Sequence, residues 1–430
     1  MTTRSARATK PGPSGRVAAD DPARLFGAPN AVTLAAHLDR HGPAPIADRD
    51  LIAEVARAGL RGRGGARFPT ARKLSAVAAG RRTVVVANGC EGEPASSKDR
   101  ALLTFAPHLV LDGAVVAAQA TGATKVLLCV ERDQPSLVAG LQTALAERRA
   151  HAPDPIPISV NEVPKRYVAG EESALVHWLN GGEAKPTLVP PRPFEQGVDR
   201  RPTLVDNVET LAQLALIARY GAGWYRTLGT ADDPGTVLLT VTGAVTRPAV
   251  YEVPGGASLD AVLTAAGGSL AETQAVLIGG YFGTWVPAAT AATMTLDSEA
   301  LAAAGASLGC GVVFALANHA CGLAESVRVA RWLAGQNAGQ CGPCVHGLDA
   351  IATAMGQLYE GRAARRTYAE LEELATLVRG RGACRHPDGA VRFVESSLRV
   401  FHEHALQHER HGPCATYRPV LPTPASGGWR

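Results

Sequence analysis

The sequence predicts an α/β fold in three parts: a parallel sheet covered by helices, a small α+β module, and a C-terminal helical bundle. Short apolar segments alternate with helical segments in the first half of the chain, as in a parallel sheet that is buried on both faces. Near Asp232 the pattern changes to alternating residues with frequent turns. After Gly322 apolar residues recur at steps of three and four, which indicates packed helices.

These patterns also give the domain limits. Strands are predicted at 83–88, 125–130 and 158–163, with helices at 108–120, 135–149, 172–179 and 208–220. The predicted organisation is a flexible N-terminal tail (1–45), the α/β domain (46–230), the α+β module with its connection (231–322), the helical bundle (323–411) and a C-terminal tail (412–430).

Composition excludes several classes of function. The net charge of +4 on 430 residues is small and the charges are interspersed, so no nucleic-acid partner is expected. No apolar run reaches the roughly 18 residues of a membrane helix, and the N-terminus lacks the apolar stretch of a secretory signal. We therefore expect a cytoplasmic protein without direct membrane insertion, free or peripheral to a membrane complex. In that compartment the eight cysteines are not expected to form disulfides.

A glycine-rich segment, "GLRGRGGARFPTARK", lies between the first predicted helix of the α/β domain and the first predicted strand. A dinucleotide-binding fingerprint has the opposite context, after a strand and before a helix. The segment nevertheless lets the backbone approach a phosphate closely, with Arg61, Arg63 and Lys73 to supply positive charge. A plain surface loop is the alternative interpretation.

Carboxylates and an amide follow two predicted elements. "NGCEGEPASSKDR" begins where the first strand ends and supplies Asn88, Glu91 and Glu93, and "YVAGEESA" places Glu171 and Glu172 at the start of a helix. Ligands of open α/β sheets bind beyond the carboxyl ends of the strands, which favours the first group as ligand contacts. Either stretch alone is more typical of a solvated charged turn.

In their order along the chain, these two stretches, the glycine segment, "PPRPFEQGVDRRPTLVDNVETLA" and "GQCGPC" resemble the family of complex I 51 kDa subunits. That family contains the flavin-bearing, NADH-oxidising subunits of respiratory complex I and of NAD-linked hydrogenases and formate dehydrogenases. The resemblance covers residues 50–401. It implies a Rossmann-like flavin domain, a ubiquitin-like (SLBB-type) α+β domain and a helical iron–sulfur domain.

The resemblance also implies a function and its residues. Electrons would pass from NADH through FMN to a [4Fe–4S] cluster and on to a small iron–sulfur protein or other subunits of a redox complex. A different donor, such as a ferredoxin, and a non-catalytic scaffold within such a complex are the alternatives. Position by position, the FMN side would comprise Gly62, Gly64, Gly65, Lys73, Asn88, Glu91, Asn207 and Thr210, and the NADH side Phe68, Glu172 and the two expected catalytic residues, Glu93 and Glu171.

The chain departs from the family pattern at several of these places. Val189 and Arg192 replace a lysine and a phenylalanine that help to hold NADH, and Ala76 replaces an aromatic residue. Cys90 and Asp206 replace an aspartate and an asparagine. The departures predict weaker NADH binding, although Arg192 can pair with a phosphate or stack on adenine.

The expected cluster ligands are Cys341, Cys344 and Cys384, but Ala338 stands where the family has its first cysteine. Four interpretations follow: a four-iron cluster with another fourth ligand, a three-iron cluster, zinc held with the help of His386, or an empty site. Candidates for a fourth cluster ligand are His386, His346, Asn337 and Cys321.

His404, His408 and His411 recur at intervals of four and three near the C-terminus. Such spacing can bind a metal from one helix face, but charged residues are interleaved. A solvated helix end is therefore the prediction.

Overall fold

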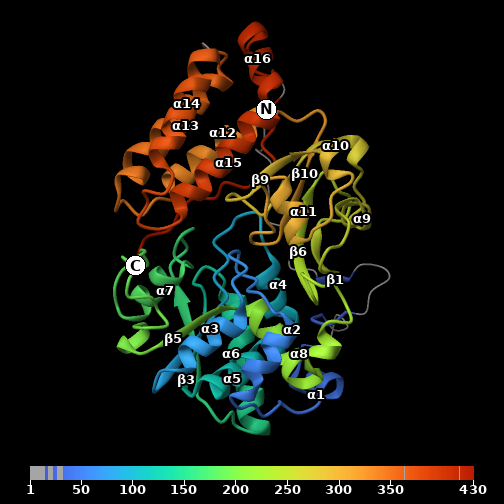
Figure 1. Ribbon diagram of the computed structural model, residues 1–430, viewed down its shortest axis with the longest axis vertical. Coiled ribbons are helices and arrows are strands. Elements are labelled where there is room, and N and C mark those ends of the chain that lie inside the picture. Colours follow the sequence, from blue (N-terminus) through green and yellow to red (C-terminus); the bar gives the residue numbers. More distant parts are fainter. Residues whose placement is uncertain (1–14, 18–22, 27–31, 363, 416) are drawn as a thin grey trace, which may run out of the picture.

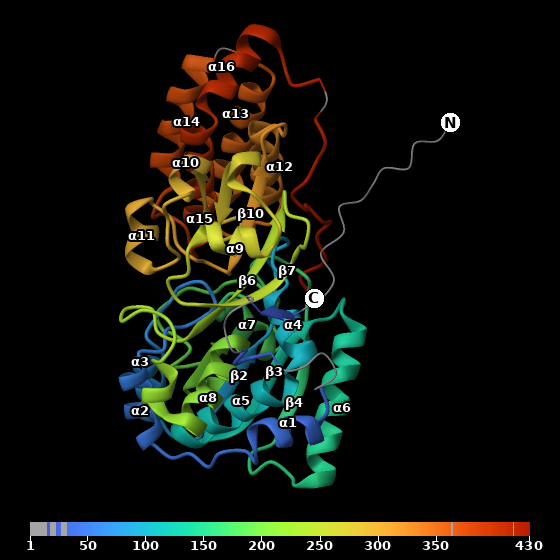
Figure 2. The ribbon, with the colours of Figure 1, turned by 90° about the vertical axis from the view of Figure 1, so that its right-hand side faces the viewer.

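The computed structural model describes residues 15–17, 23–26, 32–362, 364–415 and 417–430. The α/β domain, blue to green in Figure 1, lies below a second sheet in yellow and a helical bundle in orange and red. A view from the side shows the same stacking (Figure 2). The α/β, α+β and helical parts confirm the predicted fold class.

The α/β domain is built on a 4-stranded sheet in the order β4-β3-β2-β5, with all neighbours parallel. Its central strand is β2, where Val84, Val85 and Val86 are completely buried because helices cover both faces. The strands are β2 (Thr83–Asn88), β3 (Ala123–Glu131), β4 (Ile158–Val163) and β5 (Thr203–Asn207).

The helices of this domain pack closely enough that one contact requires glycine. A Cβ on Gly113 of α5 would lie 1.8 Å from the carbonyl oxygen of Leu211 in α8, so any side chain there would separate the two helices. The helices are α2 (Asp50–Ala58), α3 (Thr70–Ala78), α4 (Lys98–Phe105), α5 (Pro107–Thr121), α6 (Pro135–His151), α7 (Glu172–Leu179), η1 (Val198–Arg200) and α8 (Val208–Tyr225).

Part of the predicted N-terminal tail is ordered helix. Helix α1 (Leu34–His41) begins at Thr33, whose side chain accepts a hydrogen bond from the Ala36 amide. The buried ring of His37 lies 2.8 Å from Asp112 of α5, which fixes α1 on the domain. The expectation of flexibility across residues 1–45 is therefore wrong for this stretch, because α1 has tertiary partners far along the chain.

The second sheet is larger than the predicted module. It is 6-stranded, in the order β1-β7-β6-β10-β8-β9. Strand β10, which lies between β6 and β8, comes from residues well beyond the alternating stretch noted in the sequence. Its elements are β1 (Gly15–Val17), β6 (Thr236–Gly243), β7 (Ala249–Pro254), α9 (Leu259–Ala265), η2 (Leu270–Glu272), β8 (Thr273–Ile278), β9 (Thr284–Pro287), α10 (Ala288–Ala291), α11 (Ser298–Ala303) and β10 (Val312–Ala317).

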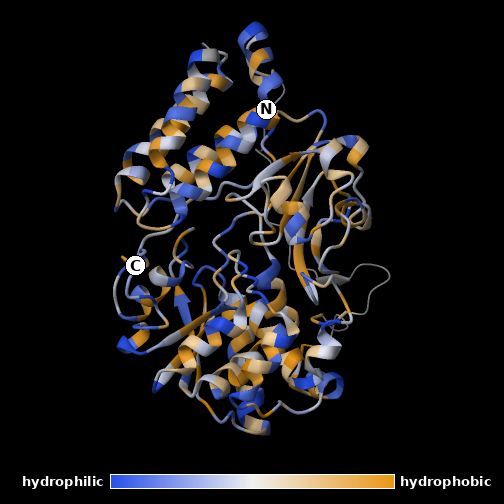
Figure 3. Cartoon of the chain, in the orientation of Figure 1, coloured by the Kyte–Doolittle hydropathy of each residue, from blue (hydrophilic) through white to orange (hydrophobic). Residues whose placement is uncertain are grey.

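The bundle shares its core with the second sheet, since Tyr281 and Trp285 pack in one cluster with Leu333 and Phe393. Bands of hydrophobic and hydrophilic residues alternate along the bundle helices (Figure 3), as expected where one face is buried. The helices are α12 (Gly322–Gly335), the π-helical turn Pro343–Gly347, α13 (Leu348–Tyr359), α14 (Ala364–Val378), α15 (His386–Val400) and α16 (His402–His411).

The C-terminal segment, residues 417–430, follows α12 from the bundle back to the α/β domain. Arg328 and Trp332 of α12 donate hydrogen bonds to the carbonyl oxygens of Leu421 and Pro424, at 3.2 and 2.8 Å. At the far end the Ala184 amide donates to the carbonyl oxygen of Trp429 at 3.1 Å. The chain therefore ends beside α7 (Figures 1 and 2).

Within the described ranges, no single helix has both the length and the apolar character of a membrane span. Helices α4 and α5 pass that test only as a pair, and they meet at an angle of 97°.

Candidate electron-transfer site

The candidate site lies at the carboxyl ends of β2 and β5. These strands end at Asn88 and Asn207, which are register partners. Strand β3 lies on the other side of β2, so the strand order reverses here, and such a switch point is where open α/β sheets bind ligands. Strand β5 was not predicted from the sequence, yet it brings the two expected FMN-side asparagines together.

The glycine segment covers this edge of the sheet. The backbone amide of Arg63 donates a hydrogen bond to the Thr210 hydroxyl at 2.8 Å, which ties the segment to the start of α8. A Cβ on Gly64 would lie 3.3 Å from the Cβ of Asn207, and Gly65 has a φ of 110° that disfavours other residues. The predicted group of Gly62, Gly64, Gly65, Asn207 and Thr210 is therefore contiguous. It forms a cradle of backbone that a side chain would fill, which suits a phosphate-bearing cofactor.

Lys73 supplies positive charge beside the cradle. Its ammonium donates to the carbonyl oxygen of Val205 and lies 3.6 Å from Glu172. Below it is Asp206, whose Oδ2 is buried and has no hydrogen-bond partner among the described residues. Burial raises the pKa of Asp206 to about 6, and the nearby Lys73 opposes the shift. An unsatisfied polar atom at this depth fits a site that is completed by a bound polar group.

Glu91 is turned towards the protein. One of its oxygens accepts hydrogen bonds from the Ser96 hydroxyl at 2.6 Å and the Asp99 amide at 3.1 Å, and the other accepts from the Arg100 amide at 3.2 Å. These amides belong to the first turn of α4, which has no internal acceptors for them. In this structure the side chain of Glu91 therefore stabilises α4.

Glu93 joins the α/β domain to the second sheet. It is buried, and its Oε2 accepts hydrogen bonds from the Tyr281 amide at 2.8 Å and the Tyr167 hydroxyl at 3.2 Å. The Glu93 carboxylate in turn raises the pKa of Tyr167, in addition to the larger effect of burial. Glu93 thus sits where the nucleotide side of the site meets the neighbouring domain.

The remaining predicted nucleotide contacts are more open. Glu171 caps α7, accepting from the amides of Ser173 and Ala174, both at 3.0 Å. The ring of Phe68 is 48% exposed, with the Arg72 guanidinium 5.5 Å from its centroid. An exposed aromatic face is available for stacking with a flat ligand.

Sequence reasoning missed a buried ion cluster behind the asparagines. The Lys98 ammonium is 2.7 Å from Asp99 and 2.9 Å from Glu209, and it donates to the Asn207 side chain at 3.3 Å. Burial alone would lower the pKa of Lys98, but the two carboxylates raise it, so the lysine stays charged. The only sequence signal was the pair Lys98–Asp99 in "SSKDR", which resembles any polar turn.

A group of aromatic rings connects this site to the bundle. Tyr167 packs edge-on against Phe282, Trp332 and His386, with ring centroids 4.8, 5.2 and 5.8 Å apart. Tyr167 belongs to the α/β domain, Phe282 to the second sheet, and the other two to α12 and α15. We call these four side chains the aromatic bridge. It extends from Tyr167, the hydrogen-bond partner of Glu93, to His386, two residues from Cys384.

The three predicted metal ligands come together at the entrance of the bundle. Burial, followed by the neighbouring Cys341 and Cys384, raises the pKa of the Cys344 thiol, and Cys341 also hydrogen-bonds it. Cys384 in turn lies close enough to Glu171 for that carboxylate to raise the pKa of its thiol, after the larger effect of burial. The cysteine set therefore faces the predicted nucleotide side of the site.

The four candidates for a fourth cluster ligand differ in what they contact. Asn337 is bonded locally to Ala334 and Gly339, and His346 is exposed. Cys321 belongs to another group of side chains, at the far end of the bundle. His386 is buried, and its Nε2 donates to the carbonyl oxygen of Leu333 at 2.9 Å. Its Nδ1 is then an acceptor, and it has no hydrogen-bond partner among the described residues.

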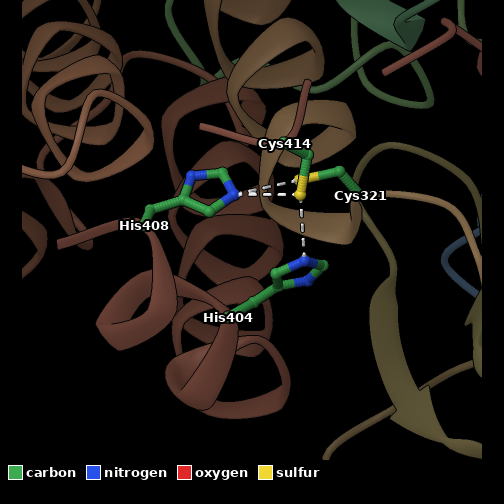
Figure 4. Close-up of side chains that lie close together, drawn as sticks. All are labelled: Cys321, His404, His408 and Cys414. Atoms are coloured by element: carbon green, nitrogen blue, oxygen red, sulfur yellow. Dashed lines mark hydrogen bonds between the residues drawn. The ribbon is translucent and has the colours of Figure 1, made fainter. Parts of the chain in front are cut away.

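A second set of ligand-type side chains, which we call the Cys/His group, comprises Cys321, His404, His408 and Cys414 (Figure 4). Their ligand atoms all lie within 4.8 Å of one another. His408 is only 2% exposed, so the prediction of a solvated helix end is wrong for this histidine. The spacing of His404 and His408 is visible in the sequence, but their partners lie elsewhere in the chain.

Comparison with known families agrees with this arrangement. Residues 55–216 match the Nuo51 FMN-binding domain, 238–277 an SLBB domain, and 325–408 the iron–sulfur binding region of NADH-ubiquinone oxidoreductase F.

Relatives and solved structures extend the match across the chain. It is 31% identical to the second F subunit of the NADH-quinone oxidoreductase of Rhizobium meliloti over 379 residues, covering 85% of this chain and 90% of that relative. The corresponding F subunit of Mycobacterium tuberculosis is 30% identical over 388 residues, covering 85% and 86%. A chain of a NAD+-reducing [NiFe]-hydrogenase in the H2-reduced state superposes with a TM-score of 0.75 at 32% identity, over 86% of this chain but 63% of that one. The chain therefore belongs to the family of NADH-quinone oxidoreductase F subunits, which are the complex I 51 kDa subunits.

Proposed function

We propose that this chain accepts electrons from NADH at the edge of β2 and β5 and passes them through FMN to an iron–sulfur cluster at the bundle entrance, for delivery to a partner protein. FMN supplies the conversion of a two-electron hydride transfer into single-electron steps. The observation that carries the proposal is the aromatic bridge. It fills the space between the two sites with packed rings, from the partner of Glu93 to the neighbour of Cys384.

Each part of the site has a proposed task. The backbone of Gly62, Gly64 and Gly65, together with Lys73, would hold the FMN phosphate. Asn88 and Asn207 would remain fixed at the strand ends by their bonds to Gly170 and Asp99, at 2.9 and 2.8 Å. Thr210 and Glu91 would act through the protein, since their bonds hold the glycine segment and α4.

The proposed NADH contacts are the more open side chains. Phe68 would stack on a ring of the nucleotide, and Glu172 would bond to a hydroxyl group. Glu93 and Glu171 are the proposed catalytic residues. They flank the path from the nucleotide to the cysteines, where they would orient the nicotinamide for hydride transfer.

For the cluster, Cys341, Cys344 and Cys384 would supply three thiolates. We propose His386 as the fourth ligand, through its unpartnered Nδ1. The zinc interpretation of this site has less support: ligands of a single ion crowd together, and the described residues form no tight group of that kind around these cysteines.

The relatives are named as subunits of quinone oxidoreductases, and the solved chains as parts of hydrogenases. We therefore propose NADH:acceptor oxidoreductase activity within a larger redox complex, with a small iron–sulfur protein or another subunit as the acceptor. The proposed location is cytoplasmic, with any membrane contact made through partners.

Flavin retention tests the placement of FMN. Gly64→Leu should abolish retention of FMN, since the side chain would fill the cradle against Asn207. Gly140→Leu is a matched control, because a Cβ at Gly140 meets nothing within 4 Å. Retained stoichiometric FMN in Gly64→Leu protein of normal circular dichroism would contradict the placement. In the wild-type chain, NADH should bleach the flavin absorbance without oxygen.

A ferredoxin-type donor is the second candidate, because Val189 and Arg192 replace the lysine and phenylalanine expected to hold NADH. Each lost contact is worth about 1 kcal/mol, which predicts roughly tenfold to hundredfold weaker NADH binding. The double variant Val189→Lys with Arg192→Phe should then lower the apparent KM for NADH. Unchanged KM, together with bleaching by reduced ferredoxin but not by NADH, would favour the second candidate.

A further inference from the structure

The Cys/His group lies at the opposite end of α13 from the cluster cysteines. Cys344 is in the turn that leads into α13, whereas His408 contacts Tyr359, the last residue of that helix. Twelve residues of helix separate the two ends by about 18 Å. We propose that Cys321, His404, His408 and Cys414 form a tetrahedral site for one zinc ion, separate from the iron–sulfur site.

The distances within the group match the edges of a tetrahedron around zinc. Typical Zn–S and Zn–N bonds at tetrahedral angles place sulfur and nitrogen ligands about 3.6 Å apart. Here Nε2 of His408 lies 3.6 Å from Sγ of Cys321 and 3.3 Å from Sγ of Cys414. Sγ of Cys414 is 3.4 Å from Nε2 of His404. Figure 4 shows both imidazole rings directed at the sulfur atoms.

The hydrogen bond at the far side of His408 fixes the tautomer that a metal requires. Its Nδ1 lies 2.8 Å from the carbonyl oxygen of Tyr359, which can only accept. The proton of the neutral ring is therefore on Nδ1, and the lone pair of Nε2 faces the two thiols. Metal-binding histidines commonly make this second bond to a backbone carbonyl.

The local structure explains how four distant residues meet. His404 and His408 are four apart on α16 and so share one face. Gly412, with a φ of 79°, ends α16 and turns the chain back, which brings Cys414 over that face. Cys321 caps α12, where its sulfur accepts the Ala324 amide at 3.4 Å. A helix N-terminus favours the thiolate form that zinc binds.

All four corners of the tetrahedron are protein ligands, so no position remains for water or a substrate. That is the arrangement of a structural zinc site. The ion would join three stretches: the link between β10 and α12 at Cys321, helix α16, and Cys414 at the start of the path into the C-terminal segment. Its task would be to hold the chain end on the bundle.

Metal analysis of the full-length protein tests the proposal. Protein purified without oxygen and without chelators should contain about one zinc per chain in addition to its iron. Cys414→Ser should lower zinc at least about tenfold and leave iron unchanged. The matched control is His411→Ala, on the same helix but exposed, which should keep its zinc.

Cobalt provides a second probe that does not depend on activity. Co2+ supplied to metal-free protein should give the intense visible bands of tetrahedral cobalt together with thiolate charge-transfer absorption, and Cys414→Ser and His404→Ala should each weaken them. Three results would overturn the proposal: wild-type protein that takes up no zinc or cobalt, equal zinc in wild type and Cys414→Ser, or a Cys321–Cys414 disulfide in protein kept under reducing conditions. Loss of zinc is measured separately from flavin and iron, so failure here leaves the proposed electron transfer untouched.

Discussion

The two ends of α13 carry two sets of ligand-type side chains that differ in spacing. At one end Cys341, Cys344 and Cys384 affect one another electrostatically but, within the described part of the chain, form no tight group of ligand atoms. At the other end two cysteines and two histidines crowd within 4.8 Å. A cluster of irons and sulfides has a volume of its own, so its ligands stand apart, whereas a single ion draws its ligands together.

The sets also differ in completeness. The cysteine set lacks one thiolate because of Ala338, and of its candidate substitutes we favour His386. The Cys/His group has its four ligands. Two metal sites in one small bundle can therefore be told apart by ligand spacing and number, and the following predictions test that separation.

The largest effect is expected from Cys344→Ser. Cys344 is buried beside both other thiols, so its loss leaves only two thiolate ligands and should remove nearly all cluster iron and sulfide. Zinc should remain at the wild-type level. Cys414→Ser is the reciprocal control, with zinc lost and iron kept. If either single variant loses both metals, the two sites are not independent.

Zinc removal is expected to have the next largest effect. A mild zinc chelator should free the chain end and speed trypsin cleavage at Arg418 by about tenfold or more, because cleavage follows local opening. Mass spectrometry of the fragments and the iron–sulfur absorbance, which should not change, provide the measurement. An unaltered cleavage rate after complete removal of zinc would show that the ion does not hold this segment.

A smaller effect is expected from supplying the missing thiolate. Ala338→Cys should slow the loss of the cluster in air several-fold, because a solvent-accessible iron is the usual point of attack. The decay of visible absorbance measures this, with Ala338→Ser as the control for the change in size. Equal lifetimes in all three proteins would indicate that residue 338 does not face the cluster.

The smallest effect is expected from His386→Leu, which keeps an apolar side chain of similar bulk against Tyr167 and Phe282 while removing Nδ1. Iron should fall from about four to about three per chain, with a three-iron EPR signal after mild oxidation. His346→Leu, at an exposed position, should change neither. Four irons in the His386 variant would show that another group binds the fourth iron.

Local patterns in the sequence predicted what depends on neighbouring residues. The strands β2 and β4 and the helices α7 and α8 have apolar or capping signals within their own segments. Strand β5 was missed because its five residues, "TLVDN", are too short to show a period. Helix α1 was missed because its partners, Asp112 and Glu147, lie far along the chain.

The same reasoning explains the error at His408. Its spacing to His404 was visible, but Cys321 is 87 positions away, and no periodicity connects them. The glycine cradle was predicted because backbone freedom is written in the residue type itself. The conversion of Glu91 into a helix-stabilising group was not, because a carboxylate in a turn has the same letters whether it faces a ligand or the protein.

The path of the C-terminal segment has a consequence for biosynthesis. Trp429 is among the last residues to leave the ribosome, yet its carbonyl accepts the amide of Ala184, in a domain made much earlier. The flavin domain can fold while translation continues, but this closing contact has to wait until the chain is released. A nascent polypeptide therefore spends the end of its synthesis with its domains formed and unfastened, and an early stop codon would leave it in that state permanently.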